Sequence, residues 1–193
     1  DFDRGYDIGE VSLSGELVKL QLKKYGVDEN SSEMRTIRSL ADEHQIKRYE
    51  EFKAKEKKDL EEARTIALQL KLKMKISDIE YQGDGKKVTF YYTSEGRVDF
   101  RELIRRYASA FKCRIQMLQV SYREEASRLG GIGSCGRELC CSTWLTDYKV
   151  VSMGAAKTQN LSINMLKLSG QCGRLKCCLN YELELYSEKL KQF

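Results

Sequence analysis

The sequence predicts an α+β protein that combines a long helix, a compact ββαβ unit and a cysteine-rich segment. Three observations predict it. Apolar residues recur every three or four positions over residues 47–75 and 99–111, as in amphipathic helices. Residues 75–93 alternate apolar and polar side chains around a Gly-Asp-Gly turn, as in a β-hairpin. Six of the seven cysteines fall in two similar motifs within residues 133–178.

Residues 1–29 are predicted to be the end of a small β-rich region. Residues 8–11 and 17–22 alternate as strands do, and Gly15 and Gly26 punctuate them. A sheet this short is marginal alone, and the sequence starts with aspartate rather than methionine. We therefore expect the chain to be a fragment whose missing N-terminal portion completes the sheet.

Residues 30–122 are predicted to form one domain, built from a helical segment and the ββαβ unit. The run Asn30-Ser31-Ser32-Glu33 is a capping pattern that predicts a helix over residues 30–46. Residues 47–75 then read as one long helix with a densely charged first half, which we interpret as a solvated face rather than an arm that docks a partner. Its apolar stripe comprises Tyr49, Phe52, Leu60, Ala63, Ile66, Leu70 and Met74.

The ββαβ unit is predicted as strands at residues 75–81 and 87–93, a helix at residues 99–111 and a strand at residues 115–120. The turn Gly83-Asp84-Gly85 joins the first two strands. The predicted core residues are Val88, Phe90, Leu103, Tyr107, Ile115 and Leu118. Because none of them is a cysteine, we expect this unit to fold independently of the sulfur chemistry.

Residues 123–193 form the predicted cysteine-rich segment, in which one motif occurs twice. The copies run from Gly133 to Trp144 and from Gly170 to Tyr181, and each reads Gly-x-Cys-Gly-Arg-x-x-Cys-Cys-x-x-aromatic. Packing alone rarely demands cysteine at matched places, since a buried apolar slot also accepts Ala, Val or Leu. The motif therefore predicts metal ligation, cluster ligation or redox chemistry. The candidate ligands are Cys135, Cys140, Cys141, Cys172, Cys177 and Cys178.

Native disulfides and inert buried thiols are the alternatives. Disulfide frameworks belong mainly to short secreted chains. This chain has 193 residues, no apolar signal stretch and no run long enough to span a membrane. We therefore expect a cytoplasmic protein without stable membrane insertion, where cysteine clusters bind metal or take part in catalysis.

The ligand count favours an iron–sulfur cluster over zinc. The only histidine, His44, lies far from the motifs, and the Cys-x4-Cys-Cys spacing differs from the Cys-x2-Cys of zinc ribbons. One zinc ion or one [4Fe–4S] cluster takes four thiolates, so two complete sites would need eight. Six cysteines therefore suit two three-ligand sites that a partner chain or an external ligand completes. Adjacent cysteines point ~100° apart on a helix, so the members of each pair can serve different sites.

The two Cys-Gly-Arg triplets fit this interpretation. Gly136 and Gly173 can adopt a positive φ and turn backbone N–H groups toward sulfur. Arg137 and Arg174 would place a cation beside thiolates, which lowers thiol pKa values and offsets cluster charge. A surface salt bridge is the alternative role for both arginines. Cys113 lies outside the motifs and is interpreted as a core residue at a helix-to-strand junction.

The basic excess of the chain lies in the cysteine-containing region. Residues 112–178 carry ten lysines and arginines against four acidic residues, whereas residues 1–111 are balanced. This excess can neutralise a dianionic cluster or face a phosphate backbone. The sequence does not separate the two uses.

The motifs and their surroundings resemble the bacterial RicT (YaaT) family, within the polymerase-suppressor-protein C-terminal domain superfamily. The resemblance is carried by residues 132–145 and 169–178, which hold the motifs, and by the run AKTQNLSIN at residues 156–164. Residues 89–120 resemble the core of that domain, and residues 4–11 resemble the end of the family's β-rich N-terminal region.

This resemblance implies a non-catalytic cytoplasmic regulatory adaptor that binds a [4Fe–4S] cluster and assists RNA processing within a multi-subunit complex. It implies that other small subunits help to complete the cluster site with their own cysteines. It also implies, as a partner, an endoribonuclease that matures messenger RNA. Zinc is the alternative metal, and RNA is a further candidate partner.

Two other functions stay open. A thiol redox protein would use the same cysteines, with an adjacent arginine activating one of them, although the sequence has no Cys-x-x-Cys motif and no phosphate loop. A direct RNA-binding protein with a structural zinc would stack a base on Tyr91, although a solvent-facing tyrosine is the simpler interpretation. Trp144 and Tyr181, which are equivalent in the two motifs, are expected to shield the sulfur atoms from water.

Overall fold

The computed structural model describes residues 5–28, 31 and 37–192. Helices and strands are mixed, as an α+β protein requires. The chain divides into two compact units, and each of the three strands passes from one unit to the other. Among the described residues, the first unit comprises residues 5–28, 31, 37–72, 79–90 and 99–117, and the second comprises residues 73–78, 91–98 and 118–192.

The N-terminal segment contains a helix where the sequence alternation predicts a strand. Helix α1 spans Glu16–Tyr25 and ends at Gly26, whose left-handed backbone (φ 65°) lets its N–H bond the last carbonyls of the helix. The strand prediction for residues 17–22 is therefore wrong. A helix satisfies its backbone hydrogen bonds internally, whereas a strand needs a neighbour. Residues 8–11 are irregular, so within residues 5–28 the structure contains no strand of the expected β-rich region.

The long helix α2 spans Glu43–Gln69, where the prediction was residues 47–75. It begins at a capping box: the Asp42 carboxylate accepts the Gln45 backbone N–H at 2.8 Å, and the Gln45 side chain accepts the Asp42 N–H at 3.0 Å. It ends before Lys71, whose positive φ of 54° is incompatible with the helix.

The separate helix predicted over residues 30–46 is not confirmed. Most of its expected cap, residues 30–33, lies outside the described residues, residues 37–42 are irregular, and residues 43–46 already belong to α2.

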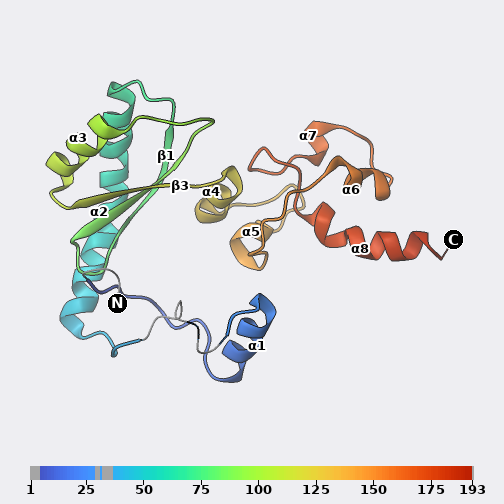
Figure 1. Cartoon of the computed structure of the whole chain (residues 1–193), viewed down its shortest axis with the longest axis horizontal. Helices are drawn as coiled ribbons and strands as arrows, with labels where there is room; N and C mark the ends of the chain where they lie inside the picture. Colours follow the sequence, from blue (N-terminus) through green and yellow to red (C-terminus); the bar gives the residue numbers. More distant parts are fainter. Residues whose placement is uncertain (1–4, 29–30, 32–36, 193) are drawn as a thin grey trace. The chain divides into compact units, whose positions relative to one another are not determined.

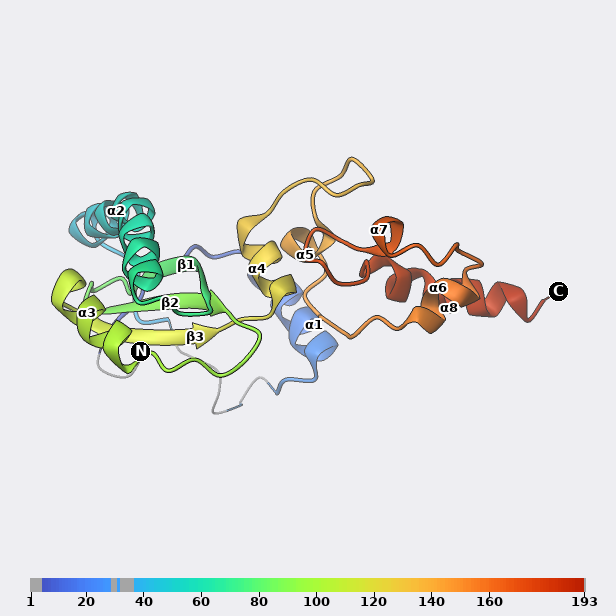
Figure 2. The ribbon, with the colours of Figure 1, turned by 90° about the horizontal axis from the view of Figure 1, so that it is seen from above.

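The ββαβ unit agrees with the prediction to within two residues at each boundary. Its elements are β1 (Lys75–Tyr81), β2 (Lys87–Thr93), α3 (Arg101–Phe111) and β3 (Arg114–Gln119). The strands lie side by side in the order β1-β2-β3 (Figure 2). The Arg114 N–H bonds the Lys86 carbonyl and the Val120 N–H bonds the Tyr92 carbonyl. From the first of these bonds to the second, the residue numbers of donor and acceptor both increase, so β3 runs parallel to β2. Helix α3 is the crossover helix between these two strands (Figure 1).

The core of the first unit is aromatic. Phe90 of β2 stacks on Tyr107 of α3, with ring centroids 4.4 Å apart, and Phe111 packs against both rings. The Tyr107 hydroxyl donates to the Ala63 carbonyl of α2 at 2.7 Å, which joins both helices to this core. Four predicted core residues are fully buried: Val88, Phe90, Leu103 and Tyr107. Leu118 is 43% exposed, so its assignment to the core is wrong: Ile115 and Met117 are the half-buried residues of β3, and alternation along the strand puts Leu118 on the opposite face.

The second unit contains the short helices that follow the sheet. They are α4 (Tyr122–Leu129), α5 (Cys140–Thr143), α6 (Met153–Thr158), α7 (Met165–Leu168) and α8 (Cys178–Leu190). A small apolar cluster forms its core, made of Val151, Ala155, Ala156, Leu168 and Leu179. The Gln159 side chain donates to the Leu179 carbonyl at 2.6 Å inside this cluster. No helix in the described part of the chain has the length and apolar character needed to cross a membrane.

Candidate metal centre

The two motif copies fold into the same turn. We call residues 133–144 copy 1 and residues 170–181 copy 2. In copy 1 the Gly133 N–H donates to the Arg137 carbonyl at 2.8 Å, and the Gly136 N–H donates to the Gly133 carbonyl at 3.0 Å. The equivalent bonds of copy 2, 37 residues later, have the same lengths. An isolated antiparallel bridge closes each turn at its base.

The glycine of each Cys-Gly-Arg triplet is required by this turn. Gly136 and Gly173 have φ angles of 78° and 70°, as predicted, and in this left-handed region a larger residue is strained. The first cysteine of each copy folds back over its turn. A Cβ built on Gly133 would lie 3.4 Å from the Cys135 Sγ, and one built on Gly170 would lie 3.8 Å from the Cys172 Sγ.

All six motif cysteines line one cavity of about 350 Å³, and every residue lining it belongs to the second unit. We call it the sulfur cavity; its cysteines are Cys135, Cys140, Cys141, Cys172, Cys177 and Cys178. All six are unbridged thiols; Cys135 is exposed and the others are half-buried. The two copies, which are 37 residues apart in the sequence, thus place their cysteines around the same cavity.

The Cys-Cys pair of each copy stands at the start of a helix. Cys140 and Cys141 open α5, while Cys177 caps α8 and Cys178 is its first residue. Both members of each pair line the sulfur cavity, although neighbouring helical side chains diverge. The Ser127 hydroxyl of α4 donates to the Cys141 carbonyl, which ties the first helix start to α4.

Two cations, Arg123 of α4 and Lys176, are among the residues that line the sulfur cavity, and Arg123 is the buried one. Its side chain is almost completely buried and donates to the Lys149 carbonyl at 3.0 Å and to the Leu175 carbonyl at 2.9 Å. Arg137 and Arg174 are exposed and are not among the residues that line this cavity. Their predicted contact with the thiols is therefore not observed in the described part of the chain.

Helix α4 is also fixed from its other side, within the same unit. The Glu125 carboxylate is buried, accepts the Ser77 hydroxyl at 3.0 Å and pairs with the Lys75 ammonium at 2.7 Å. Arg128 pairs with Asp78 at 3.2 Å. These bonds hold α4 so that Arg123 stays at the sulfur cavity.

Burial raises the pKa of the Cys141, Cys177 and Cys178 thiols above their ordinary value of 9.0. Thiols of the other copy raise the pKa of each further, whereas the Arg123 guanidinium lowers the pKa of Cys141 and Cys177. These three thiols are therefore protonated at neutral pH, and a metal must displace their protons to bind.

The donor set suits a thiolate-bound metal or cluster in kind and in number. Six thiols surround one cavity, and four suffice for zinc or for a [4Fe–4S] cluster. Among the side chains that the structure describes, no three His, Cys, Asp or Glu residues form a group that could hold a metal ion. Ligation would therefore require the thiols to turn toward a common centre.

Trp144 and Tyr181 do not lie where the sequence predicted, over the sulfur atoms. Trp144 and Tyr181 contact each other edge to face, with ring centroids 4.6 Å apart. They are 49% and 65% exposed and are not among the residues lining the sulfur cavity. The expectation that they shield the sulfur atoms is wrong, because their rings pack on one another at the surface.

Tyr91 and Cys113 were the other two residues assigned from sequence. Tyr91 is buried, and the Arg128 guanidinium lies 3.5 Å from its ring centroid, so the ring offers no open face for a base. The base-stacking hypothesis for Tyr91 is therefore wrong. Cys113 stands between α3 and β3, as predicted, and is half-buried there. Burial raises the pKa of its thiol.

Comparison with known proteins adds two family matches. The PSP1 C-terminal conserved region matches residues 35–120, and the third domain of PSP1-like proteins matches residues 150–193. The Stage 0 sporulation protein YaaT of Bacillus subtilis is 42% identical over 191 residues, which cover 98% of this chain and 66% of that protein.

Two yeast proteins match over shorter stretches. An uncharacterised protein of Schizosaccharomyces pombe is 33% identical over 63% of this chain, and the protein PSP1 of Saccharomyces cerevisiae is 46% identical over 26% of it. The chain spans about two thirds of the bacterial relative's length, and the matches cover 19% and 6% of the two yeast proteins. No solved structure matches.

Proposed function

Because this chain belongs to the RicT (YaaT) family and carries the PSP1 C-terminal region, we propose that it is a non-catalytic regulatory adaptor whose sulfur cavity binds a [4Fe–4S] cluster. The name of the bacterial relative assigns that protein to stage 0 of sporulation, a developmental step. For the present chain we propose a regulatory role in the cytoplasm, within an assembly that assists RNA processing.

The observation that carries the proposal is the position of the six thiols. Two separate sequence copies contribute three each to one cavity, although packing alone does not require sulfur at any of the six places. A cluster bound there would supply a redox-sensitive link between the copies. Four of the thiols would hold it, and the remaining two would be spare or would serve a second site completed by a partner.

The residues around the sulfur cavity provide positive charge and a fixed backbone, which suit an anionic group. Arg123 is a permanent cation held by two carbonyl oxygens, so it can offset thiolate charge without moving. The hydroxyls of Ser127 and Tyr148 both lie at the Cys141 carbonyl and so fix the backbone at one helix start. The same arrangement would suit a four-thiolate zinc site, which stays the alternative metal.

Partner subunits would dock beside this cavity. Trp144, Tyr181 and Leu185 leave large apolar surfaces exposed, and Trp144 and Tyr181 follow the Cys-Cys pairs of the two copies after two intervening residues. Exposed apolar groups of this size often mark protein interaction sites. Other small subunits, and through them an endoribonuclease, are the partners that we propose.

Thiol redox catalysis has less support from the same residues. Catalytic cysteines usually have lowered pKa values, whereas burial raises the pKa of Cys141, Cys177 and Cys178. The rise makes these thiols poorer nucleophiles at neutral pH. Metal binding is compatible with it, because a bound metal displaces the protons directly.

The test is anaerobic purification followed by iron, sulfide and zinc analysis and a visible spectrum. Wild-type protein should take up iron and sulfide on reconstitution, and C172S/C177S/C178S, which leaves only three motif thiols, should lose that uptake. Cys113→Ser is the matched control, because it removes a half-buried thiol outside the sulfur cavity. Equal uptake by wild type and C172S/C177S/C178S, or equal loss in this variant and in Cys113→Ser, would contradict the proposal.

A further inference from the structure

A second cavity, which we call the basic groove, lies in the same unit and has a volume of about 870 Å³. Its walls come from the ends of β2 and β3, the start of α4, residues 148–151, Met165 and the turn of copy 2. Its size falls within the range of small-molecule sites. The cysteine chemistry described above leaves it unexplained.

The charge of this groove is one-sided. Its lining contains three cations, Arg123, Lys149 and Arg174, and none of the described residues that line it is acidic. Apolar side chains of Val120, Val150, Val151 and Met165 form much of the remaining wall. An apolar wall with a few convergent polar groups is typical of a ligand site.

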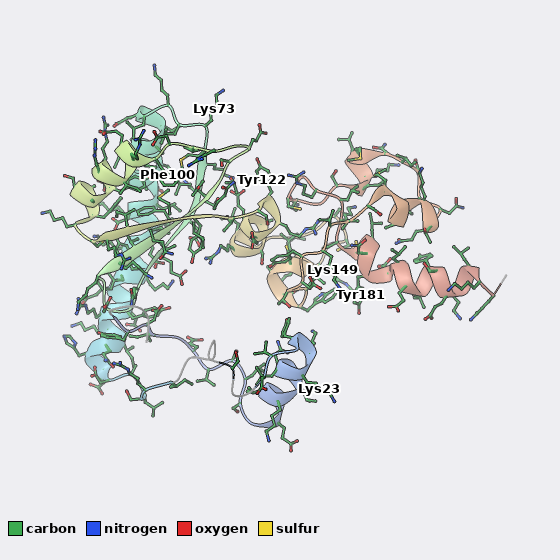
Figure 3. All side chains as sticks on the ribbon, viewed as in Figure 1. Lys23, Lys73, Phe100, Tyr122, Lys149 and Tyr181 are labelled. Carbon is green, nitrogen blue, oxygen red and sulfur yellow. The ribbon has the colours of Figure 1, made fainter. Side chains whose placement is uncertain are left out.

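We propose that the basic groove binds a small phosphate-bearing ligand. Guanidinium groups match phosphate oxygens in paired hydrogen bonds, and an ammonium adds a point charge. Two of the residues that line the groove, Tyr122 and Lys149, are labelled in Figure 3. Tyr122 precedes copy 1 in the sequence and Lys149 follows it. Lys149 pairs with the exposed Asp147 at 3.1 Å, and such a surface pair is weak enough to give way to a phosphate.

Arg174 would be the main contact. Its guanidinium lies 5.5 Å from the centroid of the Tyr122 ring, which holds the cation at the groove. The residue was predicted to stand beside the cysteines, but the structure turns it away from the sulfur cavity and into the groove. Its equivalent in copy 1, Arg137, lines neither cavity.

The groove and the sulfur cavity share part of a wall. Arg123 and Leu175 line both, and the Tyr148 hydroxyl, from the groove side, lies 3.3 Å from the Cys141 carbonyl. A phosphate in the groove would therefore compete for Arg123, the cation that faces the thiols. The inference does not depend on what the sulfur cavity binds.

The repeat supplies a matched pair of variants for the test. Arg174→Gln and Arg137→Gln remove the same charge from equivalent positions of the same turn, so a general loss of positive charge affects both equally. The full chain is titrated calorimetrically with inorganic phosphate, with uridine monophosphate and with uridine. Both phosphate-bearing probes should bind saturably at low salt, whereas uridine should not.

Arg174→Gln should weaken phosphate binding on the order of tenfold, because that is the loss of affinity expected when one hydrogen bond to a charged group is removed. Arg137→Gln should bind phosphate as wild type does. Absence of saturable binding by either phosphate probe at millimolar concentration would overturn the proposal. Equal weakening in both variants would also overturn it, as non-specific attraction. Thermal melts check folding, and if Arg174→Gln does not fold, Lys149→Gln carries the comparison.

Discussion

Copies 1 and 2 have the same turn in different surroundings. Each closes with the same two backbone bonds and a left-handed glycine. Copy 2 continues into α8, and its Leu179 is buried in the apolar cluster of the second unit. Copy 1 continues into the four-residue helix α5, and its equivalent residue, Ser142, is exposed. The shared residues thus set the turn, while the variable positions set how firmly it is packed.

This difference gives the two copies distinct roles at the sulfur cavity. Copy 2 is anchored, since Leu179 packs against α6 and α7 and its carbonyl accepts the Gln159 side chain. Copy 1 is held mainly by hydroxyl groups of Ser127 and Tyr148. We expect copy 1 to be the half that adjusts when a metal draws the thiols together.

The largest expected effect is on stability at the position that distinguishes the copies. Leu179→Ala should lower the free energy of unfolding of the second unit by about 2–5 kcal/mol, because it leaves a cavity in a small core. Ser142→Ala, at the equivalent exposed position, should change it by less than about 0.5 kcal/mol. Urea unfolding followed by circular dichroism measures both. Similar losses in the two variants would mean that the copies are packed alike.

Arg123→Met should have the next largest effect. It leaves the part-buried carbonyls of Lys149 and Leu175 without this donor, which costs about 1–3 kcal/mol. Arg137→Met removes an exposed side chain and should be close to neutral. The same urea unfolding experiment distinguishes them. If Arg123→Met were as stable as wild type, this side chain would not be part of the cavity wall.

The two triplet glycines should respond equally, since their turns are equivalent. Gly136→Ala and Gly173→Ala each place a Cβ in the left-handed region and should cost about 1–2 kcal/mol. Gly96→Ala is the control, because its added Cβ would have open space and its backbone is not left-handed. A marked difference between Gly136→Ala and Gly173→Ala, in thermal melts, would show that the turns are not equivalent in solution.

The smallest effect concerns thiol reactivity. The pKa of Cys141, Cys177 and Cys178 is raised by burial, so fewer of these thiols are ionised at neutral pH, and alkylation should be slow and accelerate as the pH rises beyond 9.0. Cys135 is exposed and should react first. Mass spectrometry after timed iodoacetamide treatment orders the sites. Fast labelling of these three half-buried thiols at neutral pH would instead indicate activated cysteines.

The sequence was most informative where local pattern and tertiary packing agree. The strands and helix between residues 75 and 119 were predicted to within two residues, because alternation, the turn glycines and burial all indicate the same elements. The positive φ of Gly136 and Gly173 followed from the turn that a Cys-Gly-Arg triplet makes.

Residues whose environment depends on distant segments could not be assigned in this way. Arg123 looks like any charged helical residue in sequence, and the two carbonyls that accept its hydrogen bonds belong to Lys149 and Leu175, 26 and 52 residues further along the chain. The capping box of Ser121 and Glu124 would have located its helix. Residues 17–22 alternate, but they also place Val18 and Leu22 one helical turn apart, and the helix prevails between Gly15 and Gly26.

Metal content after anaerobic reconstitution measures whether both copies supply one shared metal site. The two variants are C135S/C140S/C141S, which disables copy 1, and C172S/C177S/C178S, which disables copy 2. Iron, sulfide and zinc are measured per folded chain. We predict that each variant loses essentially all of the metal that wild type binds, because neither copy alone offers four thiolates. Retention of about half the wild-type metal in both variants would mean two independent sites and would contradict it.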